Sequence, residues 1–177
     1  MLAFGRRQSG SVLIGRLVCK DSALQVHHAV RAKAGYSGAR EGGEMTARQA
    51  LCSCGELRVL CEGEPAKVSI CHCDDCRRRT GSAFGIAAFF DRSRITIEGK
   101  AKLFTRNSDS GHKVDFHFCP TCGSTVFYEP ARKPDMIAVA VGTFADPLFP
   151  MPQQSVWDDK RYTWIAFPDE MLTRPLG

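Results

Sequence analysis

The sequence lacks any long apolar run, which bears first on membrane insertion. No stretch approaches the roughly 18 uninterrupted apolar residues of a membrane-spanning helix, so we expect no segment that crosses a bilayer. Apolar residues make up 44% of the 177 positions and charged residues 24%, which is typical of a folded globular protein and excludes a wholly disordered chain. This length suits one compact domain with a tail.

Most of the chain also lacks a strong excess of either charge. Residues 1–44 contain seven Lys or Arg against three acids, a net +4, so the other 133 residues carry only +1 of the total of +5. The composition therefore argues against nucleic acid as a partner held by overall charge.

The composition changes near Met45. Before this residue, glycines interrupt short apolar runs and no helical or strand period is sustained. We predict that residues 1–44 form a disordered N-terminal extension and that residues 45–177 form the folded domain. The first twenty residues contain Arg and Ser but no acid, which faintly resembles a mitochondrial transit peptide, although we favour a non-native upstream extension.

From Leu51 onward, short β-rich runs alternate with turn residues, which predicts an all-β domain. We expect strands over residues 57–60, 67–71, 84–90, 95–97, 102–105, 114–118, 125–128 and 136–141. Cys61 continues the alternation of Leu57 and Val59, so we interpret it as a small buried apolar residue. His117 alternates with two phenylalanines, so we expect it to face away from the core.

Nine cysteines is an odd number, and seven of them are closely spaced. Short spacing of this kind in a reducing compartment is typical of metal ligands rather than disulfides, so we expect a cytoplasmic zinc protein. The pair Cys119-x-x-Cys122 precedes a glycine and predicts a tight turn with both sulfurs on one metal. A structural zinc needs four ligands, and seven thiols divide into four and three, which implies two zinc ions per chain.

Two pairings can complete the site that contains this turn. In a zinc-ribbon arrangement, Cys73 and Cys76 provide the other two ligands. In the alternative, which we favour, Cys52 and Cys54 provide them and the triplet from Cys71 to Cys76 is left whole on one short loop. Three protein ligands with an open fourth position form the catalytic arrangement of zinc. Coordination there would deprotonate a substrate thiol, whose unperturbed pKa is about 8.5.

The cysteine-containing strings resemble those of the glutathione-dependent formaldehyde-activating enzyme family, which is related to centromere protein V. They are Cys52-Ser53-Cys54-Gly55, Cys71-His72-Cys73-Asp74-Asp75-Cys76-Arg77-Arg78-Arg79-Thr80-Gly81-Ser82-Ala83-Phe84 and Phe118-Cys119-Pro120-Thr121-Cys122-Gly123-Ser124. The resemblance extends from about Thr46 to Trp164, and includes Trp157 and Arg161. Ser155 departs from it, because a histidine often stands there in the family.

The resemblance implies a small zinc-bound β-sheet domain that is zinc-ribbon-like, together with a role for each cysteine. Cys52, Cys54, Cys119 and Cys122 would hold a structural zinc, and Cys71, Cys73 and Cys76 a catalytic one. The function implied is that of a zinc-dependent carbon–sulfur lyase acting on adducts of glutathione, or a similar small thiol, and an aldehyde. The alternative hypothesis is a non-catalytic zinc-binding module for protein or nucleic acid.

Three residues near the triplet have two interpretations each. Arg77 and Arg78 follow it directly and are placed to receive the carboxylates of glutathione, although most runs of charge are simply solvated. His72 lies between two proposed ligands, where an imidazole can act as a proton shuttle or be a solvated loop residue.

Truncation tests the proposed boundary of the domain. A chain that begins at Met45 should keep the melting temperature and zinc content of the full chain, because no residue before it is assigned to the core or to a metal. Calorimetry and metal analysis measure both quantities. A large loss of either would show that residues 1–44 belong to the folded unit.

Overall fold

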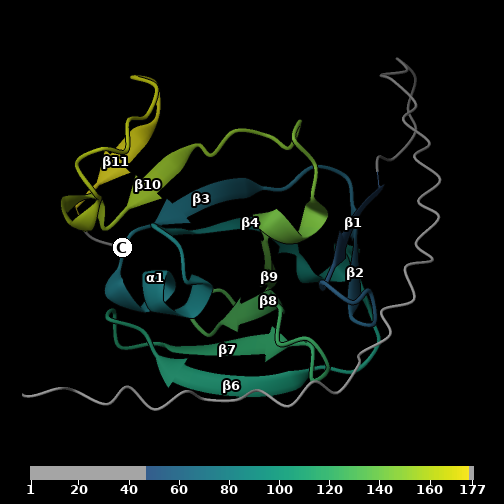
Figure 1. Cartoon of the computed structure of the whole chain (residues 1–177). Coiled ribbons are helices and arrows are strands. Elements are labelled where there is room, and N and C mark those ends of the chain that lie inside the picture. Colours follow the sequence, from purple (N-terminus) through teal and green to yellow (C-terminus); the bar gives the residue numbers. More distant parts are fainter. Residues whose placement is uncertain (1–46, 176–177) are drawn as a thin grey trace, which may run out of the picture. The chain divides into compact units, whose positions relative to one another are not determined.

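The computed structural model describes residues 47–175, which form two β-sheets (Figure 1). The predicted disordered extension, residues 1–44, lies outside the described residues and stays a prediction. The smaller sheet has the order β1-β2-β5 and is antiparallel. Its strands are β1 (Ala47–Leu51), β2 (Arg58–Glu62) and β5 (Ile95–Glu98).

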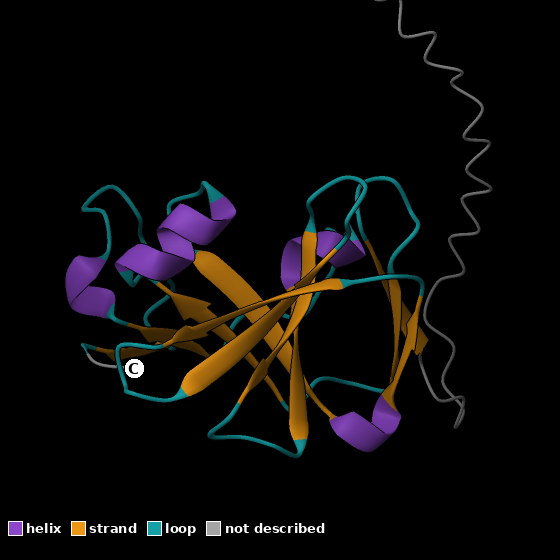
Figure 2. Cartoon of the chain, turned by 90° about the horizontal axis from the view of Figure 1, so that it is seen from below, coloured by secondary structure: helices purple, strands orange, loops and turns teal. Residues whose placement is uncertain are grey.

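The larger sheet has eight strands in the order β11-β10-β3-β4-β9-β8-β7-β6. Their bounds are β3 (Lys67–Cys71), β4 (Gly85–Asp91), β6 (Lys102–Asn107), β7 (Lys113–Phe118), β8 (Thr125–Pro130), β9 (Met136–Ala140), β10 (Gln154–Val156) and β11 (Leu172–Arg174). Strand β10 pairs in parallel with both β3 and β11, and the other pairs are antiparallel. The strands cross one another with the twist usual for sheets (Figure 2).

Helical structure in the described part of the chain is short. One α-helix, α1 (Asp74–Thr80), directly follows β3, and the 3₁₀-helices are η1 (Arg92–Arg94), η2 (Val141–Phe144) and η3 (Asp158–Lys160). Within residues 47–175, no helix has the length and apolar character needed to cross a membrane.

The core lies where the two sheets supply apolar side chains to one cluster. In β2 the burial alternates, so that Val59 and Cys61 point inward and their neighbours are exposed. From the larger sheet, Phe90, Ile137 and Val139 join the same cluster and are almost fully buried. The core therefore holds the smaller sheet against β4 and β9.

The structure confirms the all-β prediction, and each of the eight expected strands corresponds to one observed strand, β2 to β9. The prediction missed β1, β10 and β11. It was wrong about the segment after Cys73, which we expected to be a short loop and which forms α1. Two acids in the first turn and three arginines in the last complement the helix dipole, and Gly81 ends the helix with φ +60°.

Two phenylalanines provide a matched test of this core. Phe90 is 1% exposed in the cluster, whereas Phe104 on β6 is 58% exposed. Phe90→Ala should lower the free energy of unfolding by about 3 to 5 kcal/mol, because it leaves a cavity. Phe104→Ala should change it by about 0.5 kcal/mol or less. Denaturant titration measures both, and equal effects of the two changes would contradict the described packing.

Candidate metal centres

Four cysteine sulfurs lie together in one cluster. The Sγ atoms of Cys52, Cys54, Cys119 and Cys122 all lie within 4.8 Å of one another. The first two residues follow β1, and the other two lie between β7 and β8. The cluster therefore joins two turns that are far apart in the sequence.

A glycine closes each turn with a main-chain hydrogen bond, three residues after the first cysteine in one turn and four in the other. Gly55 N–H donates to the carbonyl of Cys52 at 3.0 Å, and Gly123 N–H donates to that of Cys119 at 2.9 Å. Both glycines have a positive φ, +78° and +74°, which a residue with a Cβ adopts only with strain. This explains why each cysteine pair is followed by glycine.

Hydrogen bonds between the turns hold them in place. The hydroxyls of Ser53 and Ser124 lie 2.8 Å apart, and Ser53 N–H donates to the same Ser124 oxygen at 3.2 Å. Thr121 donates to the Glu56 carboxylate at 2.6 Å. The main-chain N–H of Leu57 donates to the sulfur of Cys52 at 3.2 Å, a contact that stabilises a thiolate.

A second cluster gathers the sulfurs of Cys71, Cys73 and Cys76. Cys71 ends β3, Cys73 is the N-cap of α1, and Cys76 lies in the first turn of that helix. The Cys73 sulfur accepts a hydrogen bond from the main-chain N–H of Cys76 at 3.4 Å. Strand, cap and helix thus replace the simple loop that the spacing suggested.

The proximity of the three thiols affects their ionisation. Hydrogen bonds from Cys71 and Cys76 lower the pKa of Cys73 to about 2. Hydrogen bonds with Cys73 and with Cys76 raise the pKa of Cys71, and burial adds a smaller contribution in the same direction. One thiolate is therefore stable in the cluster, whereas a second and third need a cation beside them.

Both clusters fit a thiophilic metal ion. Sulfurs at about 2.3 Å from a tetrahedral zinc lie about 3.8 Å apart, and the Sγ separations of Cys54 to Cys52 and to Cys119 are 3.4 and 3.6 Å. These distances exceed the roughly 2.05 Å of a disulfide, and the cysteines are free thiols. The sulfurs group as four and three, with Cys73 and Cys76 beside Cys71 rather than beside Cys119.

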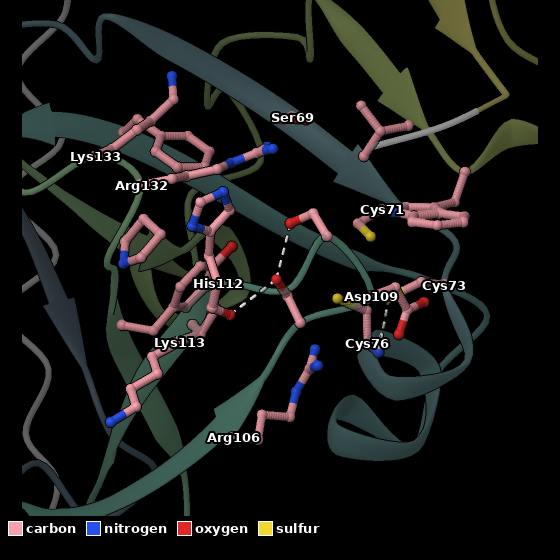
Figure 3. A pocket seen from close by; sticks show the side chains of 18 of the residues that line it. Ser69, Cys71, Cys73, Cys76, Arg106, Asp109, His112, Lys113, Arg132 and Lys133 are labelled. Atoms are coloured by element: carbon pink, nitrogen blue, oxygen red, sulfur yellow. Dashed lines mark hydrogen bonds between the residues drawn. The ribbon is translucent and has the colours of Figure 1, made fainter.

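The three-sulfur cluster opens onto a cavity of about 140 Å³. All three cysteines line it, and Figure 3 shows them on one side, with His112, Arg132 and Lys133 on the other. The apolar part of the wall consists of aromatic and aliphatic side chains: Phe89, Val114, Phe116, Tyr128, Pro130, Val156 and Trp157. A small organic molecule can therefore reach the thiols in a largely apolar setting.

Arg106 and Tyr128 are polar groups of the cavity near the thiols. Arg106 lines the wall and donates to the Asp75 carboxylate at 2.8 Å, which ties β6 to helix α1. Burial, and then the nearby Cys76 sulfur, raises the pKa of Tyr128, so its hydroxyl stays neutral and can donate a hydrogen bond.

Arg77 and Arg78 line a different depression, which contains Tyr162 and Trp164. Arg77 forms an ion pair with Asp74 and lies over the Tyr162 ring at 4.9 Å. Arg78 is exposed. Their predicted contact with glutathione carboxylates stays a prediction, and basic residues that do line the thiol cavity were missed: Lys67, Arg106, Lys113, Arg132 and Lys133.

His72 is fully buried, so the interpretation as a solvated loop residue was wrong. Its ring lies between Phe84 and Phe167, at 5.8 Å from each centroid, and burial lowers its pKa. Ser155, where the family often has histidine, is also fully buried and donates to Asp158 at 2.8 Å. It is not among the residues that line the cavity.

Two other residues can be compared with expectation. Cys61 is fully buried in the core, as its alternation predicted, and burial raises its pKa to about 12, so it stays a neutral thiol. His117 was expected to face away from the core, but it is half-buried and stacks on Phe127 at 4.3 Å with a ring angle of 8°.

This chain is similar in sequence to one known protein family. The family model described as "Glutathione-dependent formaldehyde-activating enzyme", or GFA, matches residues 47–160. The chain belongs to the GFA family. Among solved structures, a Rhodobacter sphaeroides protein is similar at 24% identity with a TM-score of 0.42, covering 54% of this chain and 85% of that one. The search of curated proteins finds no match.

The part that matches the GFA family contains both sulfur clusters and one strained residue beside them. Trp157 has φ +55°, a left-handed conformation that costs a side-chain-bearing residue about 1 kcal/mol or more, and it lines the cavity near the thiols. Lys160 lies over its ring at 4.9 Å. The turn at Trp157 therefore places an aromatic wall next to the three cysteines.

Loss of one ligand tests the four-sulfur site. Cys119→Ser should unfold the domain, because structural zinc binding supplies about 10 to 16 kcal/mol against a net stability of about 5 to 15 kcal/mol. Cys61→Ser is a matched control, since both thiols are 0% exposed and only Cys119 lies among other cysteine sulfurs. Calorimetry and zinc analysis should separate them. A soluble, cooperative and fully metallated Cys119→Ser protein would refute the ligand set.

Proposed function

We propose that this GFA-family chain is a zinc-dependent carbon–sulfur lyase acting on adducts of a small glutathione-like thiol and an aldehyde. The observation that carries the proposal is the three-thiol cluster in the wall of the cavity. No fourth His, Cys, Asp or Glu joins that cluster within residues 47–175. A ligand set of this kind leaves a coordination position for substrate.

The two clusters are assigned different roles. Cys52, Cys54, Cys119 and Cys122 would hold a structural zinc, because they offer four ligands from two distant turns. Cys71, Cys73 and Cys76 would hold the catalytic zinc. When bound there, this ion supplies a Lewis acid and lowers the pKa of a thiol that reaches it. The family description, which names glutathione and formaldehyde, supports this class of substrate.

The reaction is an addition of a thiol to an aldehyde, and it needs no oxidant or reductant. In the direction of synthesis, the thiol loses its proton and its sulfur forms a bond with the aldehyde carbon. The electrons of the carbonyl π bond move to the oxygen, which takes up a proton and becomes a hydroxyl group. The lyase direction reverses these steps and releases thiol and aldehyde, so the enzyme accelerates an equilibrium between an adduct and its two parts.

The chain's own residues prepare the cavity for this chemistry. Phe89, Phe116 and Trp157 provide apolar walls that limit water around the reacting carbon. The Tyr128 hydroxyl remains protonated and lines the same wall, where it can donate to an oxygen of the adduct. Arg106, fixed by its ion pair with Asp75, adds positive charge near the thiols, where the substrate sulfur carries negative charge.

A variant of the triplet tests the assignment of function. Cys76→Ala should lower the zinc content from two per chain towards one and abolish thiol-dependent turnover of formaldehyde. Cooperative melting and the β-sheet circular dichroism signal should remain, because the triplet lies within one short segment of the chain. Metal analysis and an assay that follows the thiol adduct measure these effects.

Cys61→Ala is the control, because Cys61 is a buried thiol outside both clusters. It should keep two zinc ions and full turnover. If Cys76→Ala keeps both, the triplet is not the catalytic site. If a zinc-loaded native chain turns over no thiol–aldehyde adduct, the alternative of a binding module replaces the proposed enzyme.

A further inference from the structure

The cavity has a second polar end, which the proposed chemistry does not use. Lys67, Ser69 and Cys71 all line it, and they alternate along β3, so their side chains lie on one face of the strand. Lys133, in the turn between β8 and β9, approaches the same end. In Figure 3, Lys133 and Arg132 lie together, across the cavity from the cysteines.

The two lysines converge on one aromatic ring. The Nζ of Lys67 lies 5.0 Å from the centroid of Phe89, and that of Lys133 lies 5.5 Å from it. Both side chains are half-buried, and Arg132 is close beside them. In the described part of the chain, no acid forms an ion pair with Lys67, Arg132 or Lys133.

This convergence of like charges is unfavourable without an anion. Burial, and then the charge of Lys133, lowers the pKa of Lys67 to about 8, with further contributions from Arg132 and Arg174. The acid among the described residues that line the cavity, Asp109, forms no ion pair with these cations. A bound carboxylate or phosphate would offset the repulsion between the cations and accept hydrogen bonds from both ammonium groups.

We propose that Lys67 and Lys133, with Arg132 beside them, form an anion subsite that selects thiols carrying a carboxylate remote from the sulfur. The inference rests on the proposed function, which places the thiol of the substrate at the cysteine end of the cavity. These residues determine specificity rather than chemistry. Arg77 and Arg78, which the sequence suggested for contact with carboxylates, line a separate depression.

The spacing along β3 limits the length of the substrate. Four residues of strand separate Lys67 from Cys71 by about 13 Å. Metal–sulfur bonds of about 2.3 Å and a charged hydrogen bond of about 2.8 Å leave roughly 6 to 10 Å between the substrate sulfur and its anion. A peptide-like thiol such as glutathione spans that gap, whereas mercaptoacetate, with its carboxylate next to the thiol carbon, is too short.

The experiment measures binding to the zinc-loaded full chain by calorimetry. Glutathione should bind more tightly than its glycyl monoethyl ester and far more tightly than mercaptoacetate. Lys67→Gln and Lys133→Gln should each weaken glutathione binding about 10- to 100-fold, and the double variant should bind acid and ester alike. Lys100→Gln, in an exposed turn outside the cavity, is the control and should bind as the native chain does.

An arm with inorganic phosphate keeps the test independent of the thiol. Addition of phosphate should change the NMR chemical shifts of the main-chain amides at residues 67–69 and 131–133 until the site is saturated. These changes should appear in the native chain and vanish in the double variant. Absence of these shifts, or an unchanged acid-to-ester ratio in the lysine variants, would overturn the subsite. If both ligands bind at the lysines but no adduct is turned over, the proposed function fails and the subsite stands.

Discussion

The main physical constraint on this structure is the repulsion between closely packed thiolates. Two clusters bring several cysteine sulfurs together in this way. In the triplet, the pKa of Cys73 is lowered and that of Cys71 is raised, so the cluster by itself accommodates one negative charge. A divalent cation removes this limit, because each thiolate then faces a positive charge instead of another anion. The arrangement of the sulfurs is thus most favourable with metal bound.

The two clusters differ in what a metal would stabilise. The four-sulfur cluster joins the turn between β1 and β2 to the turn between β7 and β8, so it connects the smaller sheet to the larger one. Bringing together two turns that are far apart in the sequence costs conformational entropy, which metal binding would offset. The triplet lies at the junction of β3 and α1, where the chain is already held by the sheet and by the Cys73 cap. A metal bound there need not bring distant segments of the chain together.

Sequence patterns predicted the strands and the cysteine groups because both leave local marks. Alternation identified β2, and the glycine after Cys122 identified the turn at Cys119, since positive φ is a local demand. The short strand β10 has no such mark: its central residue, Ser155, is buried by pairing with β3 and by the segment around Asp158. Burial of His72 likewise depends on Phe167, which is 95 residues away in the sequence.

The same distinction explains the basic residues. Arg77 and Arg78 stand out in the sequence because they follow the triplet, yet the helix turns them towards Tyr162 and away from the thiol cavity. Lys67 and Lys133 are far apart in the chain, and only the pairing of β3 with β4 and of β4 with β9 brings them to one ring. Proximity in sequence suggested Arg77 and Arg78, whereas the lysines of the thiol cavity come together only through the fold.

X-ray absorption at the zinc edge of the full chain tests the central claim most directly. Seven sulfur ligands over two ions predict two zinc ions per chain and an average of about 3.5 sulfurs per zinc at about 2.3 Å, with the remainder a lighter atom. Addition of glutathione should raise the average towards four. An average of four sulfurs before any thiol is added, or no change on its addition, would contradict an open three-thiolate site.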